Sequence, residues 1–324
     1  VYKRQALVVL GPQPLDRLEE LVIQDFAAVP EKLDGVVQAE PQPAPIRVPM
    51  FEPENLPMLV KVEPLATRRQ LQVSFPVGDY RTHYDVKPMA YVGNLVGHEG
   101  SGSLLSRLKA DGLAEGLSAG SGLAWRGGSL FSVNIALTEK GVTEYGAVLD
   151  LLFAYIDMLR AEGAQAWLYE ESAQLADLRF RFLQHGQAMN YVTSLAPALQ
   201  NYQPEDVLYG PYMMSRFDPA MIDGVVAALT PENALVVLTA PGVETDLVSP
   251  YYEVPYSVGN LGKSDVSRDA SSEKNRVATD TAPSGFSLPE PNSFIPGDVS
   301  LVKTSGKYTE KPVLLLEQPR QEIW

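Results

Sequence analysis

Residues 97–105 read Gly-His-Glu-Gly-Ser-Gly-Ser-Leu-Leu, and this stretch indicates how the chain around it folds. Its glycines allow a tight turn, and Ser101 or Ser103 can cap a helix whose apolar face begins at Leu104. The run therefore predicts a loop that enters a helix over residues 103–111. Three functions are open for a loop that also carries a His-Glu pair: a metal site, a phosphate site, and a loop that receives a peptide.

Outward from this loop, stretches of alternating apolar residues and stretches of helical spacing follow one another. The pattern predicts an α/β fold of the α+β type, with an antiparallel or mixed sheet packed against helices. The predicted strands are 6–10, 71–75, 113–121, 131–137 and 234–238. The other predicted helices are 15–26, 88–96, 142–162, 167–183 and 218–229.

The composition of the 324-residue chain excludes several classes of function. The formal net charge is −14 and no cluster of Lys and Arg offers a basic face, so we expect no nucleic-acid partner. No apolar run is long enough for a membrane helix, so we expect no membrane insertion. Cysteine is absent, which removes disulfides, thiolate metal sites and cysteine nucleophiles.

Two features indicate how the chain is organised. Residues 30–57 hold many prolines and no periodicity, which is typical of a linker. The pentapeptide Ala-Leu-Val-Val-Leu occurs at 6–10 and again at 234–238, each time before a Pro/Gly turn, which favours a duplicated domain. Both ends of the chain lie in strand-like runs, so we expect a fragment of a longer protein.

The histidines do not have the spacing of a local zinc site. A helical zinc pair needs two histidines about one turn apart, so that both ring nitrogens reach one ion. His83, His98 and His185 are far apart in the chain, and neither His-x-x-Glu-His nor His-Glu-x-x-His is present. The serine-nucleophile elbow Gly-x-Ser-x-Gly is also missing. We therefore expect no metal ligand and no catalytic residue in this chain.

A phosphate site is the second alternative for the loop at 97–105. Backbone N–H groups at a helix N-terminus attract anions. A P-loop, however, needs a Gly-Lys-Ser/Thr step, which this loop lacks, and the Glu99 carboxylate would repel an anion. A tight turn followed by a helix cap explains the glycines more simply.

The residues from Tyr91 to Lys109 read Tyr-Val-Gly-Asn-Leu-Val-Gly-His-Glu-Gly-Ser-Gly-Ser-Leu-Leu-Ser-Arg-Leu-Lys. This segment closely resembles the pitrilysin/insulysin (insulinase) family of zinc metallopeptidases, in particular its protease III-like members. Further ordered matches extend over nearly the whole chain. They include Ala6-Leu-Val-Val-Leu-Gly-Pro-Gln-Pro-Leu-Asp16, Leu71-Gln-Val-Ser-Phe-Pro76, Leu137-Thr-Glu-Lys-Gly141, Leu159-Arg-Ala-Glu-Gly163, Arg179-Phe-Arg-Phe182 and Leu288-Pro-Glu-Pro-Asn-Ser-Phe-Ile-Pro296.

The resemblance implies a parent protein of homologous α/β domains that enclose a chamber, with zinc held by a His-x-x-Glu-His motif in the first domain. Residues 1–29 would then be the C-terminal piece of that preceding catalytic-type domain, and 30–57 the Pro-rich linker. Residues 58–255 would be a non-catalytic second α/β domain, and 256–324 a linker toward the C-terminal half. Zinc would be bound by the parent outside this chain, which alone would be inactive. The implied partners are a peptide substrate and the remaining domains of the same protein.

The resemblance also implies an exosite in residues 97–121 that anchors the N-terminus of the substrate far from the zinc. The residues carried over by motif position are Gly97, Glu99, Leu117, Ala119 and Ser121. A peptide ammonium needs a carboxylate and carbonyl acceptors, which Glu99 and the loop at Gly97 can supply. The small side chains of residues 117–121 let a peptide backbone approach and pair along the strand.

The chain departs from the insulysin pattern at five positions, so we expect weaker or differently selective anchoring. The departures are Asn94 for a His, Ser101 for a Pro, Leu113 for a Trp, Ala119 for a Gly and Ser121 for a Gln.

Two alternatives stay open. Glu99 can instead interact with the dipole of helix 103–111, a role worth about 0.3–1 kcal/mol. The domain as a whole can instead be a structural or interaction domain that only closes the chamber. For the compartment, the resemblance suggests the periplasm, with the cytoplasm as the alternative.

Overall fold

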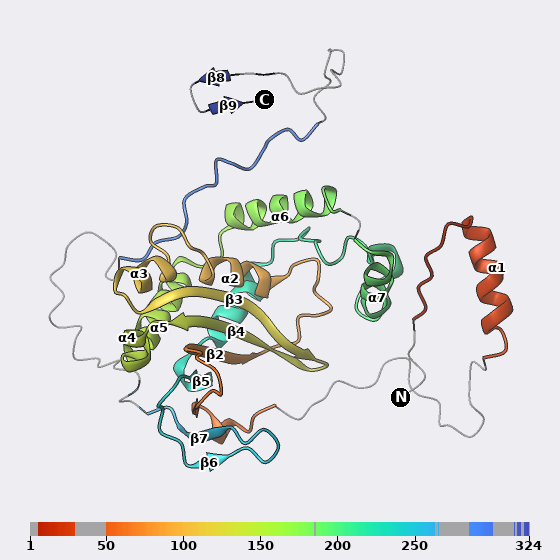
Figure 1. Cartoon of the computed structure of the whole chain (residues 1–324). Coiled ribbons are helices and arrows are strands. Elements are labelled where there is room, and N and C mark those ends of the chain that lie inside the picture. The colour runs from red at the N-terminus through yellow and green to blue at the C-terminus, as the bar shows by residue number, and fades with distance from the viewer. Residues whose placement is uncertain are drawn as a thin grey trace. The chain divides into compact units, whose positions relative to one another are not determined.

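A computed structural model of the chain describes residues 6–29, 50–184, 186–262, 265, 285–300, 314, 316–318 and 321–323 (Figure 1). The chain forms two compact units, Val1–Pro291 and Asn292–Trp324. In its described part the smaller unit contains an antiparallel hairpin of β8 (Leu316–Gln318) and β9 (Gln321–Ile323). The larger unit contains the sheet and helices that position the candidate site.

A seven-stranded mixed sheet organises the larger unit, with the strand order β3-β4-β2-β5-β1-β7-β6. Its strands are β1 (Met58–Val62), β2 (Gln70–Val77), β3 (Ala114–Trp125), β4 (Gly128–Leu137), β5 (Leu235–Thr239), β6 (Leu247–Val248) and β7 (Pro255–Asn260). Strands β1 and β5 are parallel, and the other neighbours are antiparallel. The predicted fold class, a mixed sheet packed against helices, is confirmed.

Three of the described α-helices begin at a side-chain cap. Ser103, Thr138 and Asp218 each accept a hydrogen bond from a backbone N–H of the first turn that follows. The α-helices are α1 (Leu15–Phe26), α2 (Pro88–Val96), α3 (Leu104–Ala110), α4 (Glu139–Thr143), α5 (Tyr145–Glu162), α6 (Ala166–Arg181), α7 (Ala188–Ala198) and α8 (Pro219–Ala228). Short 3-10 helices are η1 (Pro53–Asn55), η2 (Pro204–Asp206) and η3 (Pro231–Asn233).

The two faces of the sheet differ because polar and apolar residues alternate along its strands. Leu71, Val73 and Phe75 of β2 are fully buried in an apolar core that also contains residues of α2, α5 and α8. The Phe75 ring meets the Phe153 ring of α5 edge to face, with centroids 6.2 Å apart. The intervening residues of β2 are polar and lie on the opposite face of the sheet.

The predicted strand at residues 6–10 is wrong. These residues form no strand, and Leu7, Val9 and Leu10 are about half exposed. A strand needs a neighbour for its backbone hydrogen bonds, and no described segment pairs with this one. The second copy of the pentapeptide does contribute to a strand, β5. Strands β6 and β7 follow β5 in the chain, so β5 is not the last strand that the chain adds to the seven-stranded sheet.

The sheet extends beyond residue 255, where the predicted second domain ends. Strand β7 pairs antiparallel with β1 over residues 256–260. Phe286, farther along the predicted linker, is 2% exposed and belongs to the apolar core. Residues 30–49 of the first predicted linker lie outside the described residues. The division into four parts stays a prediction.

Candidate functional site

Strand β3 lies at one edge of the sheet, so its outer side has no partner strand in the described part of the chain (Figure 1). Its pairing with β4 is regular from Gly116 to Ser121 and irregular on both sides of that run. The predicted site residues Leu117, Ala119 and Ser121 all lie in the regular run. An extended edge of this kind can accept the backbone of another strand.

The side chains of these three residues do not form a common binding surface. Leu117 and Ala119 are half-buried and pack against the apolar core, whereas Ser121 is exposed. The group that β3 presents along its outer side is therefore its backbone. The small residues matter because they let another chain come close to that backbone.

Helix α2 ends directly against the same strand. A Cβ added at Gly93 would lie 2.9 Å from Gly120 Cα and 3.0 Å from Ala119 O, so only glycine fits there. A Cβ added at Gly97 would lie 3.6 Å from Ala119 N. The structure thus brings two predicted site residues, Gly97 and Ala119, together. Gly93 is not among the predicted site residues, although a glycine inside a helical pattern indicates close packing.

The loop from α2 to α3 is shaped by its own hydrogen bonds. Gly97 N–H donates to Gly93 O at 2.8 Å, and Gly100 N–H donates to His98 Nδ1 at 3.1 Å. Ser103 N–H donates to Gly100 O at 3.2 Å, which leads the chain into α3. The ring nitrogen Nδ1 of His98 is therefore occupied by a loop contact.

Glu99 is exposed and makes no side-chain hydrogen bond or ion pair within the described residues. Helix α3 begins at Leu104, Ser103 caps it, and no acidic residue lies in its first turn. The helix dipole acts mainly within the first turn. This geometry favours a carboxylate available to a ligand over one that serves the helix.

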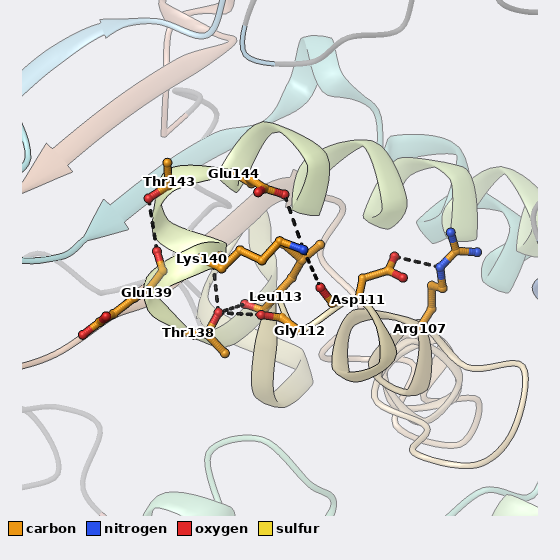
Figure 2. Close-up of polar contacts among 10 residues, drawn as sticks. Arg107, Asp111, Gly112, Leu113, Thr138, Glu139, Lys140, Thr143 and Glu144 are labelled. Carbon is orange, nitrogen blue, oxygen red and sulfur yellow. Dashed lines mark hydrogen bonds and ion pairs between the residues drawn. The ribbon is translucent and has the colours of Figure 1, made fainter.

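A polar cluster holds the turn from α3 to β3 (Figure 2). Lys140 Nζ donates to Asp111 O at 2.8 Å, and Thr138 Oγ1 donates to Gly112 O at 2.7 Å. Gly112 has a φ of +70°, a conformation that favours glycine at a helix end. Arg107 of α3 pairs with the Asp111 carboxylate at 2.8 Å. The start of β3 is therefore fixed to α4 independently of any ligand.

Asp79 holds the other end of β3, at its turn into β4. Its Oδ2 accepts a hydrogen bond from Gly127 N–H at 2.9 Å and lies 2.6 Å from Arg81 Nη2. The hydrogen bond from Arg81 is the main cause that lowers the pKa of Asp79 to about 2. The carboxylate is therefore ionised at neutral pH and anchors the hairpin by charge-assisted bonds.

Within the described ranges, no three His, Asp or Glu side chains are close enough together to hold a metal ion. His185 lies outside those ranges. No described helix combines the length and the apolarity that a membrane crossing requires.

Comparison with known families matches both halves of the chain. The family described as "Peptidase M16 inactive domain" matches residues 2–175. The family described as "Middle or third domain of peptidase_M16" matches residues 180–324.

Similar proteins include proteins of two yeasts and a plant. The A-factor-processing enzyme of Saccharomyces cerevisiae is 33% identical over 98% of this chain and 30% of its own length. Insulin-degrading enzyme-like 1, peroxisomal, of Arabidopsis thaliana is 34% identical over 98% of this chain and 31% of its own length. A Schizosaccharomyces pombe protein whose name describes a zinc protease is 32% identical over 92% of this chain and 29% of its own length.

A solved structure shares the architecture as well. The crystal structure of pitrilysin matches 96% of this chain with a TM-score of 0.81 and 25% sequence identity, and the match covers 32% of the pitrilysin chain. The chain thus spans about a third of the length of the curated relatives and of this structure.

Proposed function

The chain belongs to the peptidase M16 (insulinase) family, and from this premise we propose that it is the non-catalytic, substrate-binding part of a zinc metalloendopeptidase. The parent protein cleaves peptides in an enclosed chamber, with zinc bound outside this chain. The observation that supports a binding role is the regular outer edge of β3 beside the Gly97 loop and the exposed Glu99.

In this proposal a peptide adds to the sheet as an extended strand outside β3. Its backbone exchanges hydrogen bonds with residues 116–121, each worth about 0.5–1.5 kcal/mol net. Its ammonium group pairs with Glu99 and with carbonyl oxygens of the loop. Because an exposed ion pair contributes only about 0.2–1 kcal/mol, the backbone supplies most of the affinity and Glu99 selects the free N-terminus.

The other expectations about the parent belong to the same proposal. Its partners are a peptide substrate and the remaining domains of the same protein. The periplasmic location suggested by the resemblance has no support among the relatives, one of which is named as peroxisomal.

The test compares two versions of one labelled peptide, with a free and with an acetylated N-terminus, for binding to the full 324-residue chain. We expect the free peptide to bind about twofold to fivefold more tightly, since acetylation removes the ammonium charge. Glu99→Gln should weaken binding of the free peptide by the same factor and leave the acetylated peptide unchanged. Fluorescence anisotropy gives both dissociation constants.

Glu170→Gln is the matched control, because it removes the same charge from an exposed position on α6. It should leave the difference between the two peptides intact. Equal affinity of the free and acetylated peptides for the unsubstituted 324-residue chain would exclude the N-terminal anchor. If neither peptide binds, the alternative of a structural domain that only closes the chamber is favoured.

A further inference from the structure

The polar face of the sheet carries an open depression of about 420 Å³ beside the same stretch of β3. The residues that line it include Arg68, Arg69, Gln70, Gly116, Ser118 and Asn134. They come from the start of β2, from β3 and from β4. Leu117, one of the predicted site residues, also lines the depression, whereas these six residues were not predicted.

The register of the strands explains why polar groups gather there. Ser118 of β3 lies opposite Asn134 of β4, and Gln70 lies opposite Ala136 two residues farther along β4. Gln70 Nε2 donates to Asn134 Oδ1 at 3.1 Å, which leaves the Asn134 amide N–H groups without a hydrogen bond in the described part. The Ser118 hydroxyl is exposed and likewise has no hydrogen bond among the described residues.

The two arginines differ in their pairing. Arg69 Nη2 lies 2.5 Å from Glu139 Oε1, so its charge is largely balanced. Arg68 is exposed and has no acidic partner within the described residues. The depression therefore presents one free guanidinium and two neutral donors in a chain whose net charge is −14. Donors of this kind suit an anionic, acceptor-only ligand.

We propose that this depression is a subsite for a carboxylate side chain, Asp or Glu, of the bound peptide. Successive side chains of an extended peptide point to opposite faces of a sheet. A peptide paired outside β3 therefore directs every second side chain to the polar face, and the one opposite Gly116–Ser118 meets Arg68. The subsite rests on the proposed function, and it makes sequence selectivity depend on the register of the peptide.

The test is a scan with peptides of about ten residues that have a free N-terminus and an amidated C-terminus. Within the set, a single Glu replaces Gln at one position after another. Binding to the full chain should be about threefold to fivefold tighter for Glu at one position only, as expected for an exposed Arg–carboxylate pair. Arg68→Gln should abolish this preference, and Arg68→Lys should retain part of it, because lysine keeps the charge without the planar donor pair.

Arg179→Gln is the matched control, because it removes the same charge from an exposed position on α6 outside the depression and should leave the preference intact. If the peptides bind but Glu and Gln are equivalent at every position, the subsite is wrong and peptide binding stands. A Glu preference that survives Arg68→Gln also overturns the subsite. If no peptide binds, the proposed function and the subsite both fail.

Discussion

Asp79 shows how one side chain controls the geometry of the candidate site. It accepts hydrogen bonds from the Gly127 backbone and from Arg81, and so joins the end of β2 to the turn between β3 and β4. Because these donors stabilise the charged carboxylate, they lower the pKa of Asp79 to about 2. The contribution of the Asp79 carboxylate to the stability of the folded chain therefore depends on pH.

Replacing Asp79 by Asn should lower the free energy of unfolding at pH 7. The carboxyl pKa is near 3.9 in an unfolded chain and about 2 in the folded one, so the stabilisation is complete above about pH 4 and is lost as the pH falls toward 2. Urea denaturation of both chains between about pH 7 and pH 2 should show their difference shrinking below pH 4. Asp246→Asn, at an exposed carboxylate without a side-chain hydrogen bond in the described part, should show a small difference throughout. A difference for Asp79→Asn that does not vary with pH would contradict this account.

At the scale of elements, the candidate site depends on how α3, β3 and α4 are joined. Thr138 accepts a hydrogen bond from Gly141 N–H at 2.9 Å as the cap of α4, and its hydroxyl also donates to the carbonyl of Gly112 (Figure 2). One side chain thus begins one helix and fixes the turn that follows another. The bond to Gly141 is local, whereas the bond to Gly112 joins residues that are far apart in the chain.

Thr138→Val should destabilise the chain by about 1–2 kcal/mol, because valine keeps the shape and loses both hydrogen bonds. The matched control is Thr143→Val in the same helix, where an exposed hydroxyl makes one bond, to Glu139 O at 3.2 Å. That change should cost less than about 0.5 kcal/mol. Chemical denaturation measures both values, and equal losses would show that the two bonds of Thr138 contribute no more than the single bond of Thr143.

In the larger unit, residues 285–288 pack against elements that lie much earlier in the sequence. The Phe286 ring meets the Tyr155 ring edge to face, with centroids 5.2 Å apart, and Ser287 N–H donates to Gly102 O at 3.2 Å. Tyr155 in turn donates to Leu95 O at 3.0 Å. Residues 285–288 thereby contact the same loop that carries Glu99, so the predicted linker supports the candidate site.

Phe286→Ala should lower the free energy of unfolding by about 3 kcal/mol, the low end for a buried Phe, because the segment can partly detach. Hydrogen exchange of the Ser287 amide should become faster at the same time. The control is Phe294→Ala, at a ring that is 92% exposed, which should change stability by less than about 0.5 kcal/mol. Unchanged exchange at Ser287 would show that the ring does not hold the segment.

Elements with local sequence signals could be predicted from the amino-acid sequence. Caps and helical spacing act within one or two turns, so α1, α2, α3, α6 and α8 could be predicted nearly to their ends. Alternation likewise identified β2 and β4. The resemblance indicated the family, and the comparisons bear it out.

The pairing of the strands, and the groups exposed along their edges, depend on contacts between distant parts of the chain. Strand β1 pairs with β5, about 180 residues later, and no local pattern specifies such a partner. For the same reason the apolar run at 6–10 was mistaken for a strand, and β7 was missed. Arg68 and Asn134 look ordinary in the sequence, because their common depression exists only once β2, β3 and β4 lie side by side. The signals for a helix lie in neighbouring residues. Whether a strand lies at the edge of a sheet depends instead on which other strands pair with it.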